Sequence, residues 1–257
     1  MLEARNLTFA YGDHLVLDDI SFSLNECEMI AVLGANGAGK STMFRCLLGL
    51  FRNFKGEVLY NGKSVLNMSR RELAKSAAYI PQAESPVFNY TVLDTVLMGT
   101  TGSLSPVSSP KEEQIAIIHD ALKALGIDQL ADRGIQEISG GERQLAFLAR
   151  ALAQQSGLFV MDEPTANLDY GNQQLVLRHV KKLTEQGYTV LMSTHNPEHA
   201  LQYASKVMIL KDRELFAYGD ALEVLTEETI EQVYGMRVVI IHQTIEGKEI
   251  RSCIPVP

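Results

Sequence analysis

Residues Gly34 to Thr42 read GANGAGKST and fit the pattern GxxxxGK[ST]. The apolar run Ile30 to Leu33 precedes this stretch, and Lys40 to Leu50 follows it with no helix breaker before Gly49. These features predict a short buried strand, a glycine-rich loop and a helix, which is the structural context that the pattern requires. The sequence therefore predicts an α/β fold built around a phosphate-binding loop.

The glycine-rich loop has the chemistry of an anion site. Its glycines let backbone N–H groups turn toward phosphate oxygens, and the start of the helix adds partial positive charge. Lys40 would reach the β- and γ-phosphates of a nucleotide, and the Ser41 hydroxyl would hold Mg²⁺. A plain glycine turn that caps a helix is the simpler alternative, and the loop alone does not separate kinases, GTPases, recombinases and transport ATPases. The predicted nucleotide-binding residues of the loop are Gly34, Asn36, Gly37, Gly39, Lys40, Ser41 and Thr42.

Two adjacent carboxylates, Asp162 and Glu163, follow the apolar run Leu158 to Met161. Asp162 would hold Mg²⁺ through water, and Glu163 would polarise a water molecule that attacks the γ-phosphate. An acidic loop after a strand is the alternative interpretation. Together with the phosphate loop, two carboxylates with different tasks indicate a hydrolase.

The stretch Ile138 to Gln144, ISGGERQ, precedes a helix whose apolar face carries Leu145, Leu148, Ala149 and Leu152. Ser139 and Glu142 have the spacing of a capping box, which on its own would only start that helix. A glycine-assisted helix start is also a second anion site, because Ser139 and the free backbone N–H groups would face a phosphate. This stretch lies inside a helical insert, so we expect a second copy of the chain to bring it to the phosphate loop.

Strand-like and helical patterns alternate through most of the chain. Apolar residues alternate with serine from Ile20 to Leu24, as in a half-buried strand. From about Ser85, proline and small polar residues separate helical patterns with no strand between them, which predicts a helical insert. One helix of the insert is expected to start with a capping box at Ser109, Pro110 and Glu112 and to bury Ile115, Ile118, Leu122 and Leu125.

The second half of the chain resumes the alternation. Strands are expected at Leu158 to Met161, Thr189 to Met192 and Lys206 to Leu210, with helices near Gly171 to Gln186 and Pro197 to Tyr203. This order predicts a mainly parallel sheet. After about Leu222 we expect a polar helix, TEETIEQVY, then the apolar run MRVVII and a loose end, RSCIPVP.

The composition narrows the classes of protein to consider. The chain has 257 residues, 46% of them apolar, and 23 Lys and Arg against 31 Asp and Glu give a net charge of −8. That charge argues against broad attraction to nucleic acid or anionic lipid. Three cysteines without CxxC spacing favour neither a disulfide framework nor a zinc site. With no signal-peptide pattern at the start and no apolar run of membrane-spanning length, we expect a cytoplasmic protein that reaches a membrane only through a partner.

From Met1 to Tyr234 the sequence resembles the ATP-binding subunits of ABC transporters, because several motifs of that family occur in its order. They are Walker A at Gly34 to Thr42, the Q-loop glutamine Gln82, the signature ISGGERQ, Walker B ending at Asp162 and Glu163, the D-loop Ala166 to Asp169 and the switch histidine His195. The signature departs from the family's LSGGQ at Ile138 and Glu142. The resemblance implies a RecA-like P-loop NTPase core with an antiparallel β subdomain and a helical, signature-bearing subdomain. The expected boundaries within one ABC ATPase domain, 1–257, are 1–84 and 157–222 for the core with its β subdomain, 85–156 for the helical subdomain and 223–257 for a C-terminal appendage.

The resemblance also implies roles for single residues, with ATP and Mg²⁺ as cofactors. Glu163, His195 and Gln82 would be catalytic, and Ser41, Gln82 and Asp162 would hold the metal. Tyr11 would stack on adenine, a contact worth about 1–3 kcal/mol. In a head-to-tail dimer the nucleotide would also meet Ser139 and Gly141 of a second copy. Gly140 and Asp169 are expected to bind the nucleotide as well.

Within the family, the chain looks like importer ATPases that serve iron chelates, haem, cobalamin or molybdate. Such a subunit works on separate membrane permease subunits at the inner face of the cell membrane, with a solute-binding protein as an indirect partner and no nucleic acid. The stretch Ala83 to Val92 offers exposed apolar and aromatic groups to a permease helix, although it would serve equally as subdomain core. Two alternatives are a soluble ABC ATPase acting on nucleic acid or ribosomes, and a different P-loop enzyme such as a kinase or GTPase.

Overall fold

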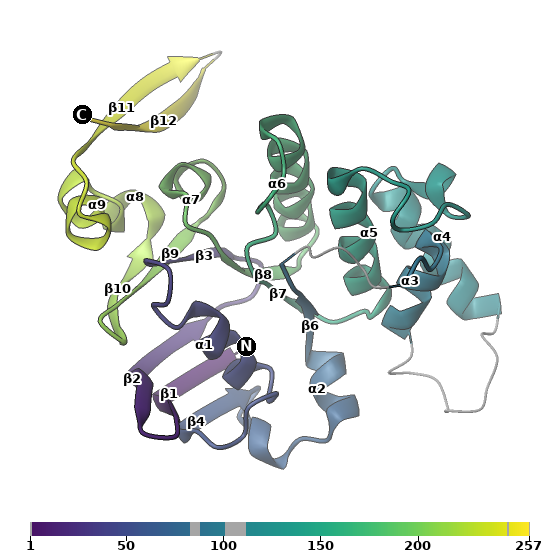
Figure 1. Ribbon diagram of the computed structural model, residues 1–257, viewed down its shortest axis with the longest axis horizontal. Helices are drawn as coiled ribbons and strands as arrows, with labels where there is room; N and C mark the ends of the chain where they lie inside the picture. The colour runs from purple at the N-terminus through teal and green to yellow at the C-terminus, as the bar shows by residue number, and fades with distance from the viewer. Residues whose placement is uncertain (1, 83–87, 101–111, 246, 257) are drawn as a thin grey trace.

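The computed structural model describes residues 2–82, 88–100, 112–245 and 247–256, and its main body is an α/β assembly of two sheets with helices around them (Figure 1). The first sheet is antiparallel, in the order β2-β1-β4-β5. Its strands are β1 (Leu2–Tyr11), β2 (His14–Leu24), β4 (Lys55–Tyr60) and β5 (Lys63–Ser64). As predicted, Ile20, Phe22 and Leu24 are buried along β2 while the serines between them are exposed.

The second sheet has the order β10-β9-β3-β8-β7-β6 and is parallel except for β10 at its edge. It contains β3 (Met29–Leu33), β6 (Ala77–Ile80), β7 (Leu158–Met161), β8 (Thr189–Ser193), β9 (Lys206–Lys211) and β10 (Glu214–Asp220). Ligands of such sheets bind beyond the carboxyl ends of the strands. The phosphate loop follows β3, Gln82 follows β6, Asp162 follows β7 and His195 follows β8. The topology therefore places these segments together at the carboxyl ends of the parallel strands.

The apolar core lies on both faces of the parallel sheet. Phe159 and Met161 of β7 pack toward the helical insert and α6 (Tyr170–Glu185), whereas Val160 packs toward α1 (Lys40–Leu47) and the antiparallel sheet. This alternation follows from the two-residue period of a strand that is buried on both sides. Further helices are η1 (Val65–Asn67), α2 (Arg70–Ser76) and α7 (Pro197–Tyr203).

The helical insert contains α3 (Val92–Thr100), α4 (Glu112–Ala124), η2 (Asp128–Leu130) and α5 (Gly140–Ala153). Ile118, Leu122 and Leu125 are buried as predicted. The prediction for Ile115 was wrong: it is 42% exposed, because it lies on the outward side of the first turn of α4. The expected cap at Ser109 and Pro110 lies outside the described residues.

The chain ends in α8 (Ala221–Val224), α9 (Glu227–Tyr234) and a hairpin of β11 (Val238–Ile245) and β12 (Lys248–Pro255), drawn in yellow in Figure 1. The polar helix was predicted within one residue, but the loose end was wrong. Arg251 to Pro255 of that stretch belong to β12, whose backbone pairs with β11 from Val238–Pro255 to Ile245–Lys248. In the described part of the chain, no helix is both long enough and apolar enough to cross a bilayer.

Candidate functional site

The phosphate loop joins β3 to α1, and its glycines have backbone angles that other residues rarely adopt. Gly34 has a φ of 147°, and a Cβ there would overlap the Leu210 carbonyl oxygen. Gly39 has a φ of 98°, and a Cβ there would lie 2.8 Å from Leu17 Cδ2. Both positions therefore require glycine, which lets the loop turn tightly over the end of β3.

Lys40 is the first residue of α1, and its side chain folds back over the loop. Its Nζ donates hydrogen bonds to the carbonyl oxygens of Gly34, at 2.7 Å, and Ala35, at 3.1 Å. Burial lowers the pKa of Lys40, and the nearby carboxylates of Glu163 and Asp162 oppose that shift. A buried ammonium held only by neutral carbonyls gains from an approaching phosphate, which offers a charge-assisted bond.

A depression of about 570 Å³ opens in front of this loop. It unites one group of predicted residues, namely Tyr11, Asn36, Gly37, Gly39, Lys40, Ser41, Thr42, Gln82, Asp162 and Glu163. His14, Val16 and Ala38 also line it and were not predicted. The basic loop and the acidic pair therefore face one space, the arrangement that a nucleotide and a divalent cation need.

Asp162 and Glu163 are held in place by Ser193 at the end of the neighbouring strand β8. The Ser193 hydroxyl donates to Asp162 Oδ1 at 2.7 Å and accepts the Glu163 backbone N–H at 2.9 Å. The hydroxyl of Tyr79 lies 3.4 Å from the second oxygen, Asp162 Oδ2. Asp162 is buried, so these bonds offset its desolvation and orient it toward the depression. With Ser41 on the same depression, the donor set fits Mg²⁺, which prefers oxygen ligands.

Glu163, which lines the depression, lies beside His195. His195 Nδ1 lies 3.5 Å from Glu163 Oε2, and His195 is exposed. Glu163 has a φ of 45°, an uncommon conformation for a residue with a side chain. The Ser193 bond to its backbone N–H helps to hold that conformation.

Tyr11 and Gln82 stand at the border of the depression. The Tyr11 hydroxyl lies 3.4 Å from Thr42 Oγ1, and its ring packs edge-on against Phe9 and Phe51. Because 47% of Tyr11 is exposed, part of its ring remains open to a base. Gln82 is exposed just beyond β6. Base stacking by Tyr11 and metal binding by Gln82 remain predictions.

The signature residues and Asp169 do not line the depression. Ser139 caps α5 in a complete capping box with Glu142, and Asp169 caps α6 by accepting the Asn172 N–H at 2.9 Å. The two helix starts lie against each other: an added Cβ on Gly141 would overlap the Asn172 side chain, and one on Gly140 would lie 3.1 Å from Leu168. They form a second surface, which we call the signature surface (Ser139 to Gly141 with Leu168 to Asn172).

The structure also identifies residues that sequence reasoning missed. Ser193 had a weak signal, as a serine near the end of a predicted strand shortly before His195. Asn172 had none, because its contact with Gly141 joins segments far apart in the sequence.

Comparison with known proteins places this geometry in a family. The ABC transporter family model matches residues 17–166. An ABC transporter ATP-binding protein of Haemophilus influenzae is 40% identical over 96% of the chain and 94% of the relative. The iron(3+)-hydroxamate import ATP-binding protein FhuC of Bacillus subtilis is 34% identical over 93% of the chain and 90% of its own length. The molybdate import ATP-binding protein MolC of Haemophilus influenzae is also 34% identical, over 91% of the chain and 88% of its own length.

A solved structure agrees with these relatives. A metal-chelate type ABC transporter in an inward-facing conformation matches with a TM-score of 0.88 and 31% identity, over 100% of this chain and 97% of that one. The predicted α/β P-loop NTPase fold and the predicted family are thereby confirmed. The chain belongs to the ABC transporter family, as an ATP-binding, ATP-hydrolysing subunit.

Proposed function

We propose that this subunit powers the import of a metal chelate or metal-containing solute through a separate membrane permease, at the inner face of the cell membrane. It would work as a head-to-tail dimer that holds ATP between two copies. One observation supports the dimer: the signature surface does not line the depression that holds Lys40 and Glu163. A second copy would place its signature surface against the nucleotide bound in this depression.

In the proposed mechanism, each residue acts on the nucleotide according to its place in the depression. Lys40 leaves the carbonyls of Gly34 and Ala35 to bind the β- and γ-phosphates. Glu163 accepts a proton from the attacking water, and His195 beside it contacts the γ-phosphate. Asp162 and Ser41, with Gln82, would hold Mg²⁺, which supplies charge neutralisation at the phosphates.

ATP would close the dimer because its γ-phosphate bonds both copies. Moving the pair from 1:99 to 99:1 in favour of the closed form requires about 5.5 kcal/mol of differential binding. Charge-assisted hydrogen bonds contribute about 1.5–3 kcal/mol each, so four such bonds across two sites supply roughly 6–12 kcal/mol. ADP lacks the γ-phosphate, so hydrolysis would reopen the pair.

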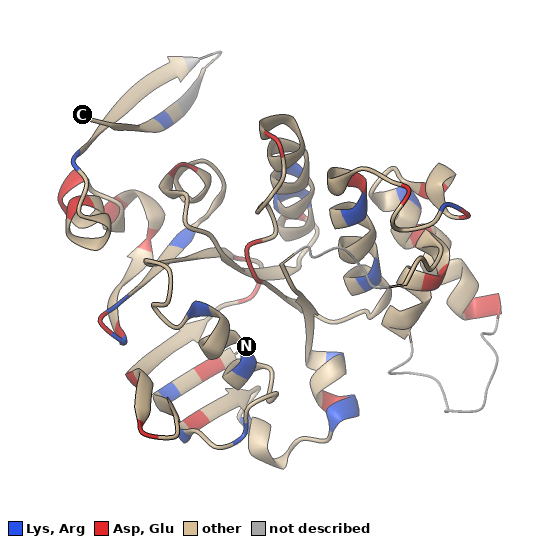
Figure 2. Cartoon of the chain, in the orientation of Figure 1, with Lys and Arg blue, Asp and Glu red and all other residues tan. Residues whose placement is uncertain are grey.

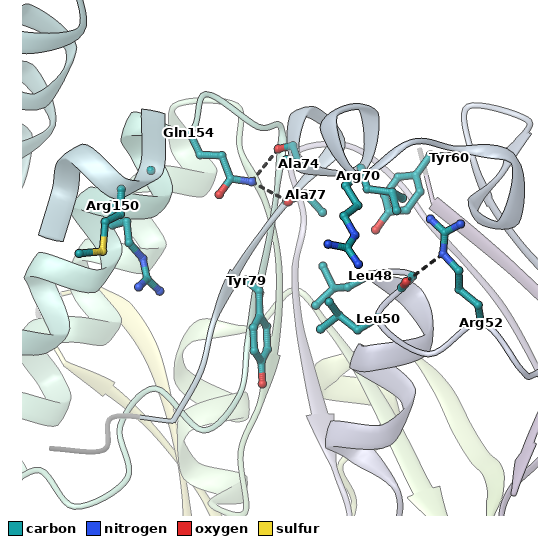
Figure 3. Close-up of a pocket in the computed structure, with 14 residues that line it drawn as sticks. Leu48, Leu50, Arg52, Tyr60, Arg70, Ala74, Ala77, Tyr79, Arg150 and Gln154 are labelled. Carbon is teal, nitrogen blue, oxygen red and sulfur yellow. Dashed lines mark hydrogen bonds between the residues drawn. The ribbon is translucent and has the colours of Figure 1, made fainter. Parts of the chain in front are cut away.

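A groove between the core and the helical insert is suited to the permease (Figure 3). It has a volume of about 730 Å³, and Gln154, the C-cap of α5, lines it and donates to the carbonyls of Ala74 and Ala77. In the described part of the predicted docking stretch, Phe88 is 65% exposed and Tyr90 is 47% exposed, whereas Val92 is buried. The groove's apolar walls come from both sides, from Leu48, Leu50, Leu73, Tyr79 and Met98.

The charge of the groove indicates the chemistry of its partner. Arg52, Arg70 and Arg150 line it, and none forms a salt bridge with another described residue. Burial lowers the pKa of Arg150. A permease helix with an acidic residue beside apolar ones would complement such a groove.

Charge reversal in the groove tests the permease contact. Arg70→Glu should abolish solute-stimulated ATPase activity of the reconstituted transporter while the isolated subunit keeps its basal activity. Lys123→Glu, on the exposed side of α4, is the matched control and should leave both activities intact. Equal stimulation in Arg70→Glu would exclude the groove as the docking site.

The cargo needs a separate test, because iron-hydroxamate and molybdate relatives are equally similar in identity. ATP turnover by the complex in lipid with its binding protein should rise with one of four solutes: a ferric chelate, haem, cobalamin or molybdate. In this proposal the solute-binding protein delivers the cargo and selects which of these solutes is imported. If none of the four stimulates turnover, the metal-uptake assignment fails.

A soluble ABC ATPase acting on nucleic acid or ribosomes is the alternative. Figure 2 shows Lys and Arg interspersed with Asp and Glu along the elements, and the net charge is −8. This pattern does not favour phosphate-backbone binding. Copurification distinguishes the two proposals. A membrane permease that copurifies with the chain would support import, whereas a ribosome or nucleic acid that copurifies with it would contradict import.

A further inference from the structure

The C-terminal helix α9 packs against the base of the phosphate loop. Its last residue, Tyr234, lies on the apolar cluster that contains Leu33, the residue directly before Gly34. The chain then leaves through Gly235, whose φ of 67° ends the helix. The appendage thus reaches the base of the phosphate loop through one aromatic side chain.

The Tyr234 hydroxyl is buried and has no hydrogen-bond partner among the described residues. The Gly34 backbone N–H lies close enough to affect the pKa of Tyr234, which burial raises to about 12, but the pair does not reach hydrogen-bonding geometry. An unpaired buried hydroxyl destabilises the state in which it occurs. A partner in another state of the protein would therefore favour that state.

The phosphate loop is the part next to Tyr234 that must rearrange. Here the Lys40 ammonium is bonded to the Gly34 carbonyl at 2.7 Å. When Lys40 turns to bind phosphate, that bond is lost and Gly34 is free to shift.

Tyr234 itself is braced. Glu227, at the start of α9, accepts the Ile240 N–H of the hairpin at 2.8 Å. The hairpin is anchored in turn by Glu198 of α7, which accepts bonds from the Ser252 hydroxyl at 2.9 Å and the Cys253 N–H at 2.7 Å. These bonds fix the chain on both sides of Tyr234, at the start of α9 and in the hairpin that follows it.

We propose that Tyr234 is a positioning residue for the phosphate loop: in the nucleotide-bound loop, the Gly34 N–H donates a hydrogen bond to the Tyr234 hydroxyl. The bond is made only after Lys40 has left the Gly34 carbonyl, so it contributes to nucleotide affinity and not to the stability of the nucleotide-free protein. This inference rests on nucleotide binding at the loop and gives the C-terminal appendage a role in it.

Tyr234→Phe removes only the hydroxyl and keeps the ring. With the full chain and Mg·AMP-PNP as the probe, it should raise the dissociation constant about 2- to 10-fold, the effect of one neutral hydrogen bond. The melting temperature of the nucleotide-free protein should stay the same or rise. Tyr218→Phe is the matched control, because the Tyr218 hydroxyl already donates to the Ser23 carbonyl at 2.7 Å, in β2. It should lower that melting temperature and leave the dissociation constant unchanged.

Two results for Tyr234→Phe would overturn the proposal: an unchanged dissociation constant, or a lower melting temperature without nucleotide. Lys40→Ala distinguishes this failure from failure of the nucleotide site. If the parent binds Mg·AMP-PNP no better than Lys40→Ala does, the site itself is wrong.

Discussion

Ser193 shows how one hydroxyl can anchor two consecutive acidic residues, one through its carboxylate and the other through its backbone N–H. It donates to the Asp162 carboxylate and accepts the Glu163 backbone N–H, so the residues proposed to hold the metal and to polarise water share one anchor. Glu163 keeps its side chain free of that anchor and close to His195. Because Ser193 does not bind the Glu163 side chain, that side chain would be able to accept a proton in the proposed mechanism.

Glu163→Gln tests this proposed role. Glutamine keeps the size of the side chain but cannot act as a base, so we expect turnover to fall about 10²- to 10⁴-fold while ATP still binds. The closed dimer should then accumulate, and size-exclusion chromatography with Mg·ATP should show it. A variant with normal turnover would remove Glu163 from the base role.

Among single residues, the sequence was informative where local pattern and chemistry coincide. Lys40, Asp162 and Glu163 could be predicted because each follows a short apolar strand. Ser193 and Tyr234 could not, because their roles depend on neighbours that only the folded chain supplies.

The starts of α5 and α6 form one packed unit at the signature surface. Gly141 lies so close to Asn172 that a methyl group would overlap its amide, and Asn172 Nδ2 donates to the capping residue Asp169 at 2.6 Å. The signature and the D-loop are thus held together within one chain. A movement of one helix start would be passed to the other.

A pair of substitutions tests this packing. Gly141→Ala should destabilise the protein by about 1–3 kcal/mol, as overpacking does, and lower its ATPase activity. Asn172→Ala makes room for the methyl group, so adding it should recover most of the lost stability. Thermal unfolding of the four proteins measures the coupling, and additive effects would mean that the two residues do not touch.

The helix α2, which carries Arg70 and Leu73 into the groove, depends on pH through its capping box. Lys63 and Ser69 lower the pKa of Glu72 from 4.5 to about 2. Because the folded-state pKa is depressed, the stabilisation is complete above pH 4.5 and is lost as the pH falls toward 2. Acid titration of unfolding should therefore show a smaller loss of stability over this range in Glu72→Gln, and an identical loss would contradict the assignment.

Whole elements were predicted best where both periodicity and flanking residues agreed, as for β7, α6 and α7. The C-terminal hairpin was missed because β12 has no strong alternation of its own. β12 pairs locally with β11, and its bonds to Glu198, 55 residues before Cys253, are the long-range contacts that hold it in the fold.

In the molecule as a whole, the parallel sheet gathers the phosphate loop, Gln82, Asp162 and His195 at one edge, while the helical insert carries Ser139 elsewhere. One chain therefore presents two separate surfaces, which the proposed dimer would join into one nucleotide site. The expected subdomain boundaries at 84, 156 and 222 remain predictions, as does the dimer that would join the two surfaces.

Ser139→Arg should separate nucleotide binding from hydrolysis. The variant keeps the depression around Lys40, so Mg·AMP-PNP should bind to the monomer as it does to the parent. Arginine should block the approach of the second copy, so ATP turnover should be lost. Glu142→Gln, which retains a capping-box side chain, is the control and should hydrolyse ATP normally. Normal turnover in Ser139→Arg would contradict the shared site.

The most direct test is the crystal structure of Glu163→Gln with Mg·ATP. Each nucleotide should contact Lys40 and Ser41 of one copy together with Ser139 and Gly141 of the other. A nucleotide that meets Ser139 of the same chain, or that has no second copy beside its γ-phosphate, would contradict this arrangement.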